Sequence, residues 1–136
     1  MLIHNKYDKF GNLIYHKDSE GVEYWYEYDS NNNEIHFKAS IGFEIWRDFD
    51  SNNNETHYKN TDGLEYWKDY DQNNNEVHYK RMDAFESWRE YDSNNKQIHY
   101  KDTAGIENWM EYDAEGNLIH YKDSEGREKW FDRAEV

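Results

Sequence analysis

This chain of 136 residues has no cysteine and no proline, and it has only seven glycines. Without cysteine, it can form neither disulfides nor thiolate metal sites. No proline-rich or Gly/Ser-rich stretch interrupts the sequence, so nothing marks a linker between domains. We therefore expect one domain over residues 1–136.

Basic residues are also scarce, with 16 Lys and Arg against 30 Asp and Glu, which gives a formal net charge of −14. Such a chain would repel the phosphate backbone, so we expect no direct binding to nucleic acid. A protein with a basic surface is a more natural partner. The alternative is that the acidity only keeps the protein soluble and monomeric.

Long apolar runs are absent. No segment approaches the length that spans a bilayer, and Met1–Lys6 lacks the apolar stretch of a signal peptide. We therefore expect a cytoplasmic protein that does not associate with membranes.

What the sequence does have is a strict period of 21 residues, marked by tryptophan. The six tryptophans are Trp25, Trp46, Trp67, Trp88, Trp109 and Trp130. A fixed period of this size indicates a repeat protein, in which one supersecondary unit is copied along the chain. Disordered segments do not place their aromatic residues so regularly, so we expect the chain to be folded.

Each repeat reads as a pair of short strands. In the last repeat, Leu118–Lys122 and Arg127–Asp132 alternate with period 2, and turn residues flank both. We predict an all-β fold of six 21-residue hairpins that form one antiparallel meander of about twelve strands. A sheet this wide should twist and curl into a strip or superhelix. The units span about residues 7–27, 28–48, 49–69, 70–90, 91–111 and 112–132.

The same kinds of turn residue recur in the two turns of each repeat. The first turn follows a Tyr-Asp pair or its equivalent, and its fourth residue is Gly11, Gly116 or one of four asparagines. Gly and Asn tolerate a left-handed backbone, so one residue with positive φ per turn is the simplest account. The second turn carries glycine at the same place in every copy except Ala84, which should therefore be strained.

Loop lengths predict the register. A three-residue second turn, Ser124–Gly126, pairs Lys122 with Glu128 and His120 with Trp130. A four-residue first turn, Asp113–Gly116, would place Trp109 opposite His120. One face would then carry a Trp–His–Trp ladder beside a row of Lys–Glu pairs. The histidines of this ladder are His36, His57, His78, His99 and His120, and Tyr15 takes the first place.

The same register predicts an acidic column that faces further carboxylates. Glu27 would lie opposite Glu34, Asp48 opposite Glu55, and Asp69 opposite Glu76. Facing like charges destabilise a sheet, so they point to a function in binding. The predicted partner-binding residues are Glu27, Glu34, Asp48, Glu55, Asp69, Glu76, Glu90 and Glu111. Asp132 would be the last member of the column.

The residue pattern argues against metal binding, cofactor binding and catalysis at these columns. Successive histidines lie two strands apart, about 9.5 Å, which is too far to share a metal ion. No loop has the spacing of a calcium motif, and we find no nucleophile motif, phosphate loop or cofactor fingerprint. We expect no catalytic, metal-binding or cofactor-binding residues. The tryptophans could pack the sheet or stack on sugars.

The first-turn motifs Tyr28-Asp29-Ser30-Asn31-Asn32-Asn33 and Tyr112-Asp113-Ala114-Glu115-Gly116-Asn117-Leu118 resemble the YD repeat of Rhs-type proteins. The resemblance covers roughly residues 7–132 and implies β-hairpin repeats. In large Rhs proteins such repeats coil into a shell around a toxin. At 136 residues this chain is too short for a shell, so that role is not carried over.

Three functional hypotheses follow. The leading one is a non-catalytic interaction protein, an inhibitor or immunity protein that binds a basic, nucleic-acid-binding surface as a nucleic-acid mimic. The second is a carbohydrate-binding module that uses the aromatic ladder. The third is a structural YD-repeat fragment. A homodimer that buries the apolar face is a further alternative for the assembly.

Overall fold

The computed structural model describes residues 4–131, which form thirteen β-strands and no helix. The strands hydrogen-bond in sequence order and form an antiparallel meander. They are β1 (His4–Tyr7), β2 (Leu13–Lys17), β3 (Glu23–Tyr28), β4 (Glu34–Ala39), β5 (Glu44–Phe49), β6 (Glu55–Asn60), β7 (Glu65–Tyr70), β8 (Glu76–Arg81), β9 (Glu86–Tyr91), β10 (Gln97–Asp102), β11 (Glu107–Tyr112), β12 (Leu118–Asp123) and β13 (Glu128–Trp130).

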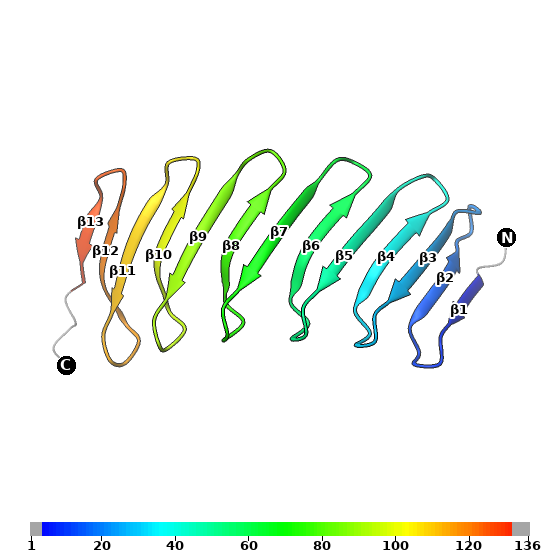
Figure 1. Ribbon diagram of the computed structural model, residues 1–136, viewed down its shortest axis with the longest axis horizontal. Coiled ribbons are helices and arrows are strands. Elements are labelled where there is room, and N and C mark those ends of the chain that lie inside the picture. The colour runs from blue at the N-terminus through cyan, green and yellow to red at the C-terminus, as the bar shows by residue number, and fades with distance from the viewer. Residues whose placement is uncertain (1–3, 132–136) are drawn as a thin grey trace. The chain divides into compact units, whose positions relative to one another are not determined.

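The predicted all-β antiparallel meander is therefore confirmed. Its strands number thirteen rather than about twelve, because His4–Tyr7 forms an additional strand ahead of the first predicted hairpin (Figure 1). In the part of the chain that is described, no helix is long and apolar enough to cross a membrane.

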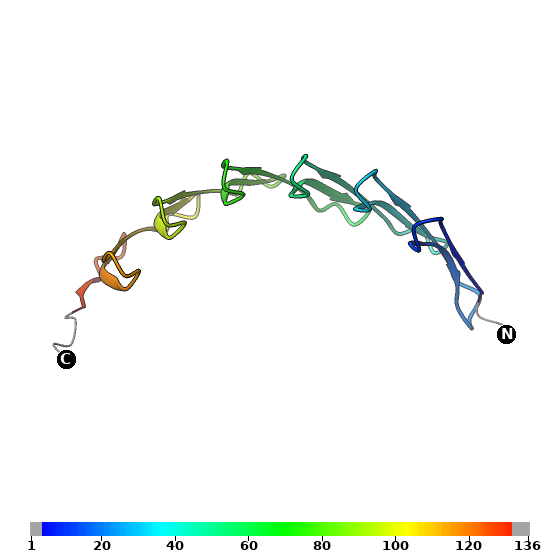
Figure 2. The same ribbon diagram turned by 90° about the horizontal axis from the view of Figure 1, so that it is seen from below.

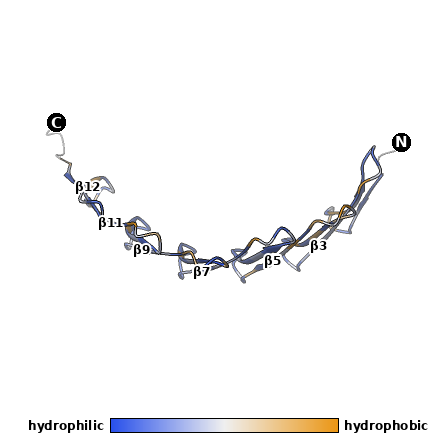
Figure 3. Ribbon diagram, turned by 90° about the horizontal axis from the view of Figure 1, so that it is seen from above, coloured by the Kyte–Doolittle hydropathy of each residue, from blue (hydrophilic) through white to orange (hydrophobic). Residues whose placement is uncertain are grey.

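The described residues fall into two units, divided between Trp67 and Lys68. Seen edge-on, each unit is a single curved layer of strands (Figure 2). Hydrophilic residues dominate the strands of each unit (Figure 3). Neither face of a unit is covered by a second layer of its own.

A single layer leaves almost nothing fully buried. Within residues 4–131, Ala39 is the one buried hydrophobic residue, and no large side chain is fully buried. Cross-strand pairs take the place of a core. On the face opposite the tryptophans, Tyr26 and Phe37 have ring centroids 5.2 Å apart, and Tyr58 stacks on Tyr66 at 5.0 Å.

Both turns of a repeat have the same hydrogen-bonded geometry. In the first turn of the last repeat, Asp113 N donates to Asn117 O at 2.9 Å, and Gly116 N donates to Asp113 O at 3.0 Å. In the second turn, Asp123 and Gly126 make the equivalent bonds. The predicted left-handed residues are confirmed. They are Asn32, Asn53, Asn74 and Asn95 with φ of 63° to 66°, the glycines, and Ala84 with φ of 73°.

The predicted strand pairing is confirmed across the second turn and is wrong across the first. As predicted, His120 pairs with Trp130 and Lys122 with Glu128. Across the first turn, however, His120 pairs with Glu111, and Trp109 pairs with Lys122. The loop has three residues instead of four. A β-bulge follows it and shifts the pairing of β12 with β11.

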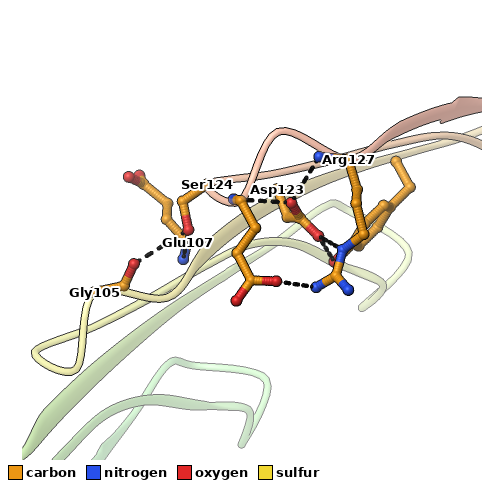
Figure 4. Close-up of polar contacts among 7 residues, drawn as sticks. Gly105, Glu107, Asp123, Ser124 and Arg127 are labelled. Atoms are coloured by element: carbon orange, nitrogen blue, oxygen red, sulfur yellow. Dashed lines mark hydrogen bonds and ion pairs between the residues drawn. The ribbon is translucent and has the colours of Figure 1, made fainter.

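Neighbouring hairpins are tied together at the second turn. Ser124 N donates to Glu107 O at 2.8 Å, and Glu107 N donates back to Ser124 Oγ at 3.0 Å (Figure 4). The Ser124 hydroxyl also donates to Gly105 O. Ser40, Thr61 and Thr103 make the same two bonds with the first residue of β3, β5 and β9, respectively.

A second tie joins the first turns of neighbouring repeats. The Asn33 side-chain amide donates to the side-chain oxygen of Asn53 at 2.8 Å. Asn12 donates to Asn32 and Asn75 donates to Asn95 in the same way, each at 2.9 Å. The left-handed asparagines therefore do more than tolerate a positive φ, because their side chains accept a bond that glycine could not accept.

Candidate interaction face

Five histidines on the tryptophan face each bridge two carboxylates on neighbouring strands. His57 Nδ1 lies 3.1 Å from Asp48 on the preceding strand, and its Nε2 lies 2.7 Å from Glu65 on the following strand. We call the preceding-strand acids the acidic column and the bridging residues the histidine column. The five bridges are Glu27–His36–Glu44, Asp48–His57–Glu65, Asp69–His78–Glu86, Glu90–His99–Glu107 and Glu111–His120–Glu128.

Each histidine ring also stacks on the tryptophan of the following strand. For the first four bridges the ring centroids are 5.3–5.7 Å apart, and the planes lie within about 21° of parallel. His120 and Trp130 stack at 3.6 Å. The predicted Trp–His–Trp ladder is thus half right, since each histidine lies between a carboxylate and a tryptophan.

The two carboxylates favour the protonated imidazole. Hydrogen bonds to Glu86 and Asp69 raise the pKa of His78 above 6.5. Bonds to Glu111 and Glu128 do the same for the pKa of His120. Burial alone would lower the pKa of His36, His57 and His99, but the carboxylate bonds outweigh burial and leave each pKa raised. The carboxylates therefore favour the cationic form of every histidine in the column.

The acidic column is more exposed than the rest of each bridge. The side chains of Glu27, Asp48, Asp69, Glu90 and Glu111 are 61–74% exposed. The first four Nε2 partners, Glu44, Glu65, Glu86 and Glu107, are 25–28% exposed. The face of each unit thus presents a row of accessible carboxylates, about 9.5 Å apart because alternate strands contribute them.

The predicted pairing of carboxylate with carboxylate is wrong. Glu27 faces His36, whereas Glu34 pairs with Tyr28. Neighbouring residues on a strand point to opposite faces, so the bulge sends Glu34 to the face opposite Glu27. The same shift pairs Asp48 with His57 and Glu55 with Phe49. Asp69 likewise bonds His78 rather than facing Glu76.

The carboxylates on the opposite face are held by the chain's own cations. Arg47 bonds Glu34 at 2.8 Å and lies 3.2 Å from Glu55. Glu76 pairs with Arg89 and, at 3.7 Å, with Lys68. Of the predicted partner-binding residues, Glu34, Glu55 and Glu76 are therefore engaged within the protein. Asp132 lies outside the described residues.

The first hairpin replaces the bridge with different chemistry. Tyr15 stands in the histidine position, as predicted, pairs with Trp25, and donates its hydroxyl to Glu23 at 2.7 Å. Its partner on the preceding strand is Lys6, whose ammonium lies 5.3 Å from the Tyr15 ring centroid. A lysine thus replaces the acid in the hairpin whose central residue, tyrosine, cannot become a cation.

Within residues 4–131, no group of three or more His, Asp or Glu side chains is arranged to hold a metal ion. The histidine bridges were missed at the sequence level because they depend on the loop length of the first turn and on the β-bulge that follows it. The loop length had a signal in the sequence, whereas the bulge had none. Both turns share the spacing Asp-x-x-Gly/Asn, so the three-residue geometry inferred for the second turn applied to the first as well.

No protein-family model and no curated protein matches this chain. Solved structures do. TcdB2-TccC3-TEV matches with a TM-score of 0.70 at 12% identity, over 88% of this chain and 7% of that one. TcdB2-TccC3-Cdc42 matches with a TM-score of 0.69 at 15% identity, over the same shares. The Photorhabdus luminescens Tc holotoxin pore with TccC3-D651A matches at 0.56 and 13% identity, over 90% of this chain and 9% of that one.

At these identities the likeness concerns the fold alone. It supports a YD-repeat-like β-meander, in line with the resemblance of the turn motifs. The chain spans less than a tenth of the length of the structures that it matches.

Proposed function

We propose that this chain is a non-catalytic β-repeat strip whose acidic column binds a basic surface of a protein partner. The observation that carries the proposal is the row of five exposed carboxylates, at one strand position in alternate strands. A net charge of −14 adds long-range attraction for a basic partner. The narrower form of the proposal is a nucleic-acid mimic that inhibits a nucleic-acid-binding protein.

The single-layer architecture suits such a role. Because neither face of a unit is covered by a second layer of its own strands, the carboxylates of each unit lie on a surface that a partner can approach. Charged side chains on such surfaces mainly set the association rate and specificity. The histidine bridges hold each carboxylate in place, so less side-chain entropy is lost when a partner binds.

The test compares two variants that lose the same number of negative charges. The column variant carries Glu27→Gln, Asp48→Asn, Asp69→Asn, Glu90→Gln and Glu111→Gln. An amide oxygen can still accept the bond from histidine, so the bridges are retained. The control variant carries five changes in the second and first turns, Glu20→Gln, Asp62→Asn, Asp83→Asn, Glu115→Gln and Glu125→Gln.

Affinity capture from host lysate with quantitative mass spectrometry should find a basic partner that the control variant retains and the column variant loses. For the narrower form, duplex DNA should compete with this chain for that partner. Binding should weaken steeply with salt, since exposed charges are screened. Equal capture by both variants would contradict the proposal.

A carbohydrate-binding function is the second candidate, and the observation in its favour is that the tryptophans are not buried. Trp25, Trp46, Trp67, Trp88 and Trp109 are 37–39% exposed. One ring face of each tryptophan from Trp46 to Trp109 is, however, covered by histidine. A glycan array without hits would remove this candidate.

A further inference from the structure

The residue before each tryptophan is large in the first three repeats and becomes a serine in the fourth. These residues are Tyr24, Ile45, Tyr66, Ser87, Asn108 and Lys129. They lie on the face opposite the tryptophans, because neighbouring residues of a strand point to opposite sides. Ser87 is 2% exposed and lines a cavity of about 280 Å³. The small side chain therefore coincides with open space on this face.

The third repeat shows how a large residue uses the same position. Tyr66 stacks on Tyr58, with ring centroids 5.0 Å apart and planes within 7° of parallel. Its hydroxyl donates to Glu55 at 2.6 Å. Glu55 also lies 3.2 Å from Arg47, so pairing with a cation does not prevent this carboxylate from accepting the phenol. One stacked ring and one carboxylate thus hold the phenol ring of Tyr66.

The fourth repeat keeps these two groups and lacks the phenol. Tyr79 and Glu76 come 21 residues after Tyr58 and Glu55. Tyr79 pairs with Ser87 across β8 and β9, where Tyr58 pairs with Tyr66 across β6 and β7. Ser87, Tyr79 and Glu76 all line the cavity. Its position therefore corresponds to that of the Tyr66 ring in the third repeat.

The other residues of the lining leave room for one ring. They are Lys68, Phe85, Arg89 and Tyr100, and the whole lining lies in the second unit. Phe85 meets Tyr79 edge-on, with ring centroids 6.2 Å apart, and does not stack on it. Lys68 and Arg89 pair with Glu76. A cavity of about 280 Å³ is large enough for a single ring, since an apolar cavity of about 150 Å³ already binds benzene.

The fifth repeat does not have the same combination. Asn108 is also smaller than tyrosine, but Gln97 stands where Glu55 and Glu76 stand in the earlier repeats. A neutral amide accepts a weaker hydrogen bond than a carboxylate does. The fourth repeat therefore combines a small residue before the tryptophan with a carboxylate acceptor.

We propose that the cavity at Ser87 binds a small phenol, with its ring stacked on Tyr79 and its hydroxyl donating to Glu76. In Tyr66 the ring carbon opposite the hydroxyl carries the link to the backbone, so the same carbon of the ligand points toward Ser87. This orientation favours a free phenol over a tyrosine side chain of another protein, because Ser87 blocks the path that its backbone would need. The site lies on the face opposite the acidic column, so the inference goes beyond the proposed function and does not depend on it.

The probe for this site is 4-fluorophenol, titrated against the whole chain and followed by fluorine NMR. Its control is 4-fluorotoluene, in which a methyl group of similar size replaces the hydroxyl and cannot donate. We expect saturable binding of 4-fluorophenol and binding of 4-fluorotoluene that is weaker by about tenfold, because the bond to a charged acceptor is lost. Unlabelled phenol should displace the probe, whereas N-acetyltyrosinamide should not.

Two variants that place a tyrosine before a tryptophan test the location. Ser87→Tyr supplies the ring from the chain itself, so it should abolish binding and raise the urea midpoint by filling the cavity. Ile45→Tyr introduces the same residue at the same strand position in the first unit and should leave binding unchanged. If Ser87→Tyr does not fold, Ser87→Ile takes its place, since the second repeat has isoleucine there.

Four results would overturn the inference: no saturable binding of 4-fluorophenol, equal binding of 4-fluorotoluene, equal displacement by phenol and N-acetyltyrosinamide, or binding retained after Ser87→Tyr. The first three are measured on the unmodified chain, so they do not depend on the folding of a variant. The proposed function is judged separately, by partner capture with the column variant, and either proposal can fail while the other stands.

Discussion

In the first hairpin the central position of the tryptophan face is Tyr15, and the neighbour on the preceding strand is Lys6. In the five later copies the central residue is histidine, and the neighbour is Asp or Glu. Both arrangements bond the following-strand glutamate, at 2.7 Å from the Tyr15 hydroxyl and at 2.7–2.8 Å from histidine Nε2.

The difference shows that the acidic column is matched to the charge of its neighbour. Where the central residue can be protonated, the preceding strand supplies an acid, and where it cannot, that strand supplies a cation over the ring. The carboxylates are therefore counter-charges for histidine as well as candidates for partner binding. A cationic partner must share them with the imidazoles.

Removing one bridge should give the largest effect. His57→Ala leaves Asp48 and Glu65 without the group between them, and we expect the free energy of unfolding to fall by about 2 kcal/mol, since the bonds are charge-assisted but partly exposed. Tyr15→Phe removes one neutral donor and should cost about 1 kcal/mol. Urea denaturation followed by circular dichroism measures both.

A conversion of one arrangement into the other sharpens this test. His57→Tyr combined with Asp48→Lys reproduces the first hairpin at a later repeat and should recover about half or more of the loss seen for His57→Ala. His57→Tyr alone should recover less, because Asp48 then lacks its cation. Equal stability of the single and double variants would show that the two positions are not coupled.

The pH dependence of stability should separate the two arrangements next. The folded-state pKa of each bridging histidine is raised above 6.5. Their contribution to stability is therefore fully present below about pH 6.5 and is lost as the pH rises through the higher folded-state value. We expect the urea midpoint to fall between pH 6 and pH 9.

A variant with glutamine at all five bridging histidines provides the control. Glutamine keeps a hydrogen-bonding side chain without titrating in this range, so its urea midpoint should stay nearly constant from pH 6 to pH 9. A midpoint that falls equally in both proteins would assign the pH dependence to other groups.

The sequence predicts most of the fold because the period of 21 and the alternation within strands are local signals. The left-handed Asn53 and the Lys122–Glu128 pairing also follow from short-range turn chemistry. The bulge does not, because it leaves no residue signature of its own. Since one added residue exchanges the faces of a strand, missing it misplaced Glu34, Glu55 and Glu76 while leaving the strand assignments intact.

The smallest expected effect concerns the first turns, where inner copies have asparagine and the outer ones Gly11 and Gly116. Asn53→Gly loses the bond from Asn33 and should cost about 0.5 kcal/mol, because the relaxed backbone of glycine offsets part of the lost hydrogen bond.

Gly116→Asn should bring no gain. Lys96 stands in the donor position there, and its Cε would lie 3.4 Å from a new Cβ. Combining Gly116→Asn with Lys96→Asn should recreate the tie and raise stability above that of Gly116→Asn alone, as measured by thermal denaturation. If Gly116→Asn stabilises by itself, the asparagines of the inner turns are explained by their backbone preference and not by the bond between repeats.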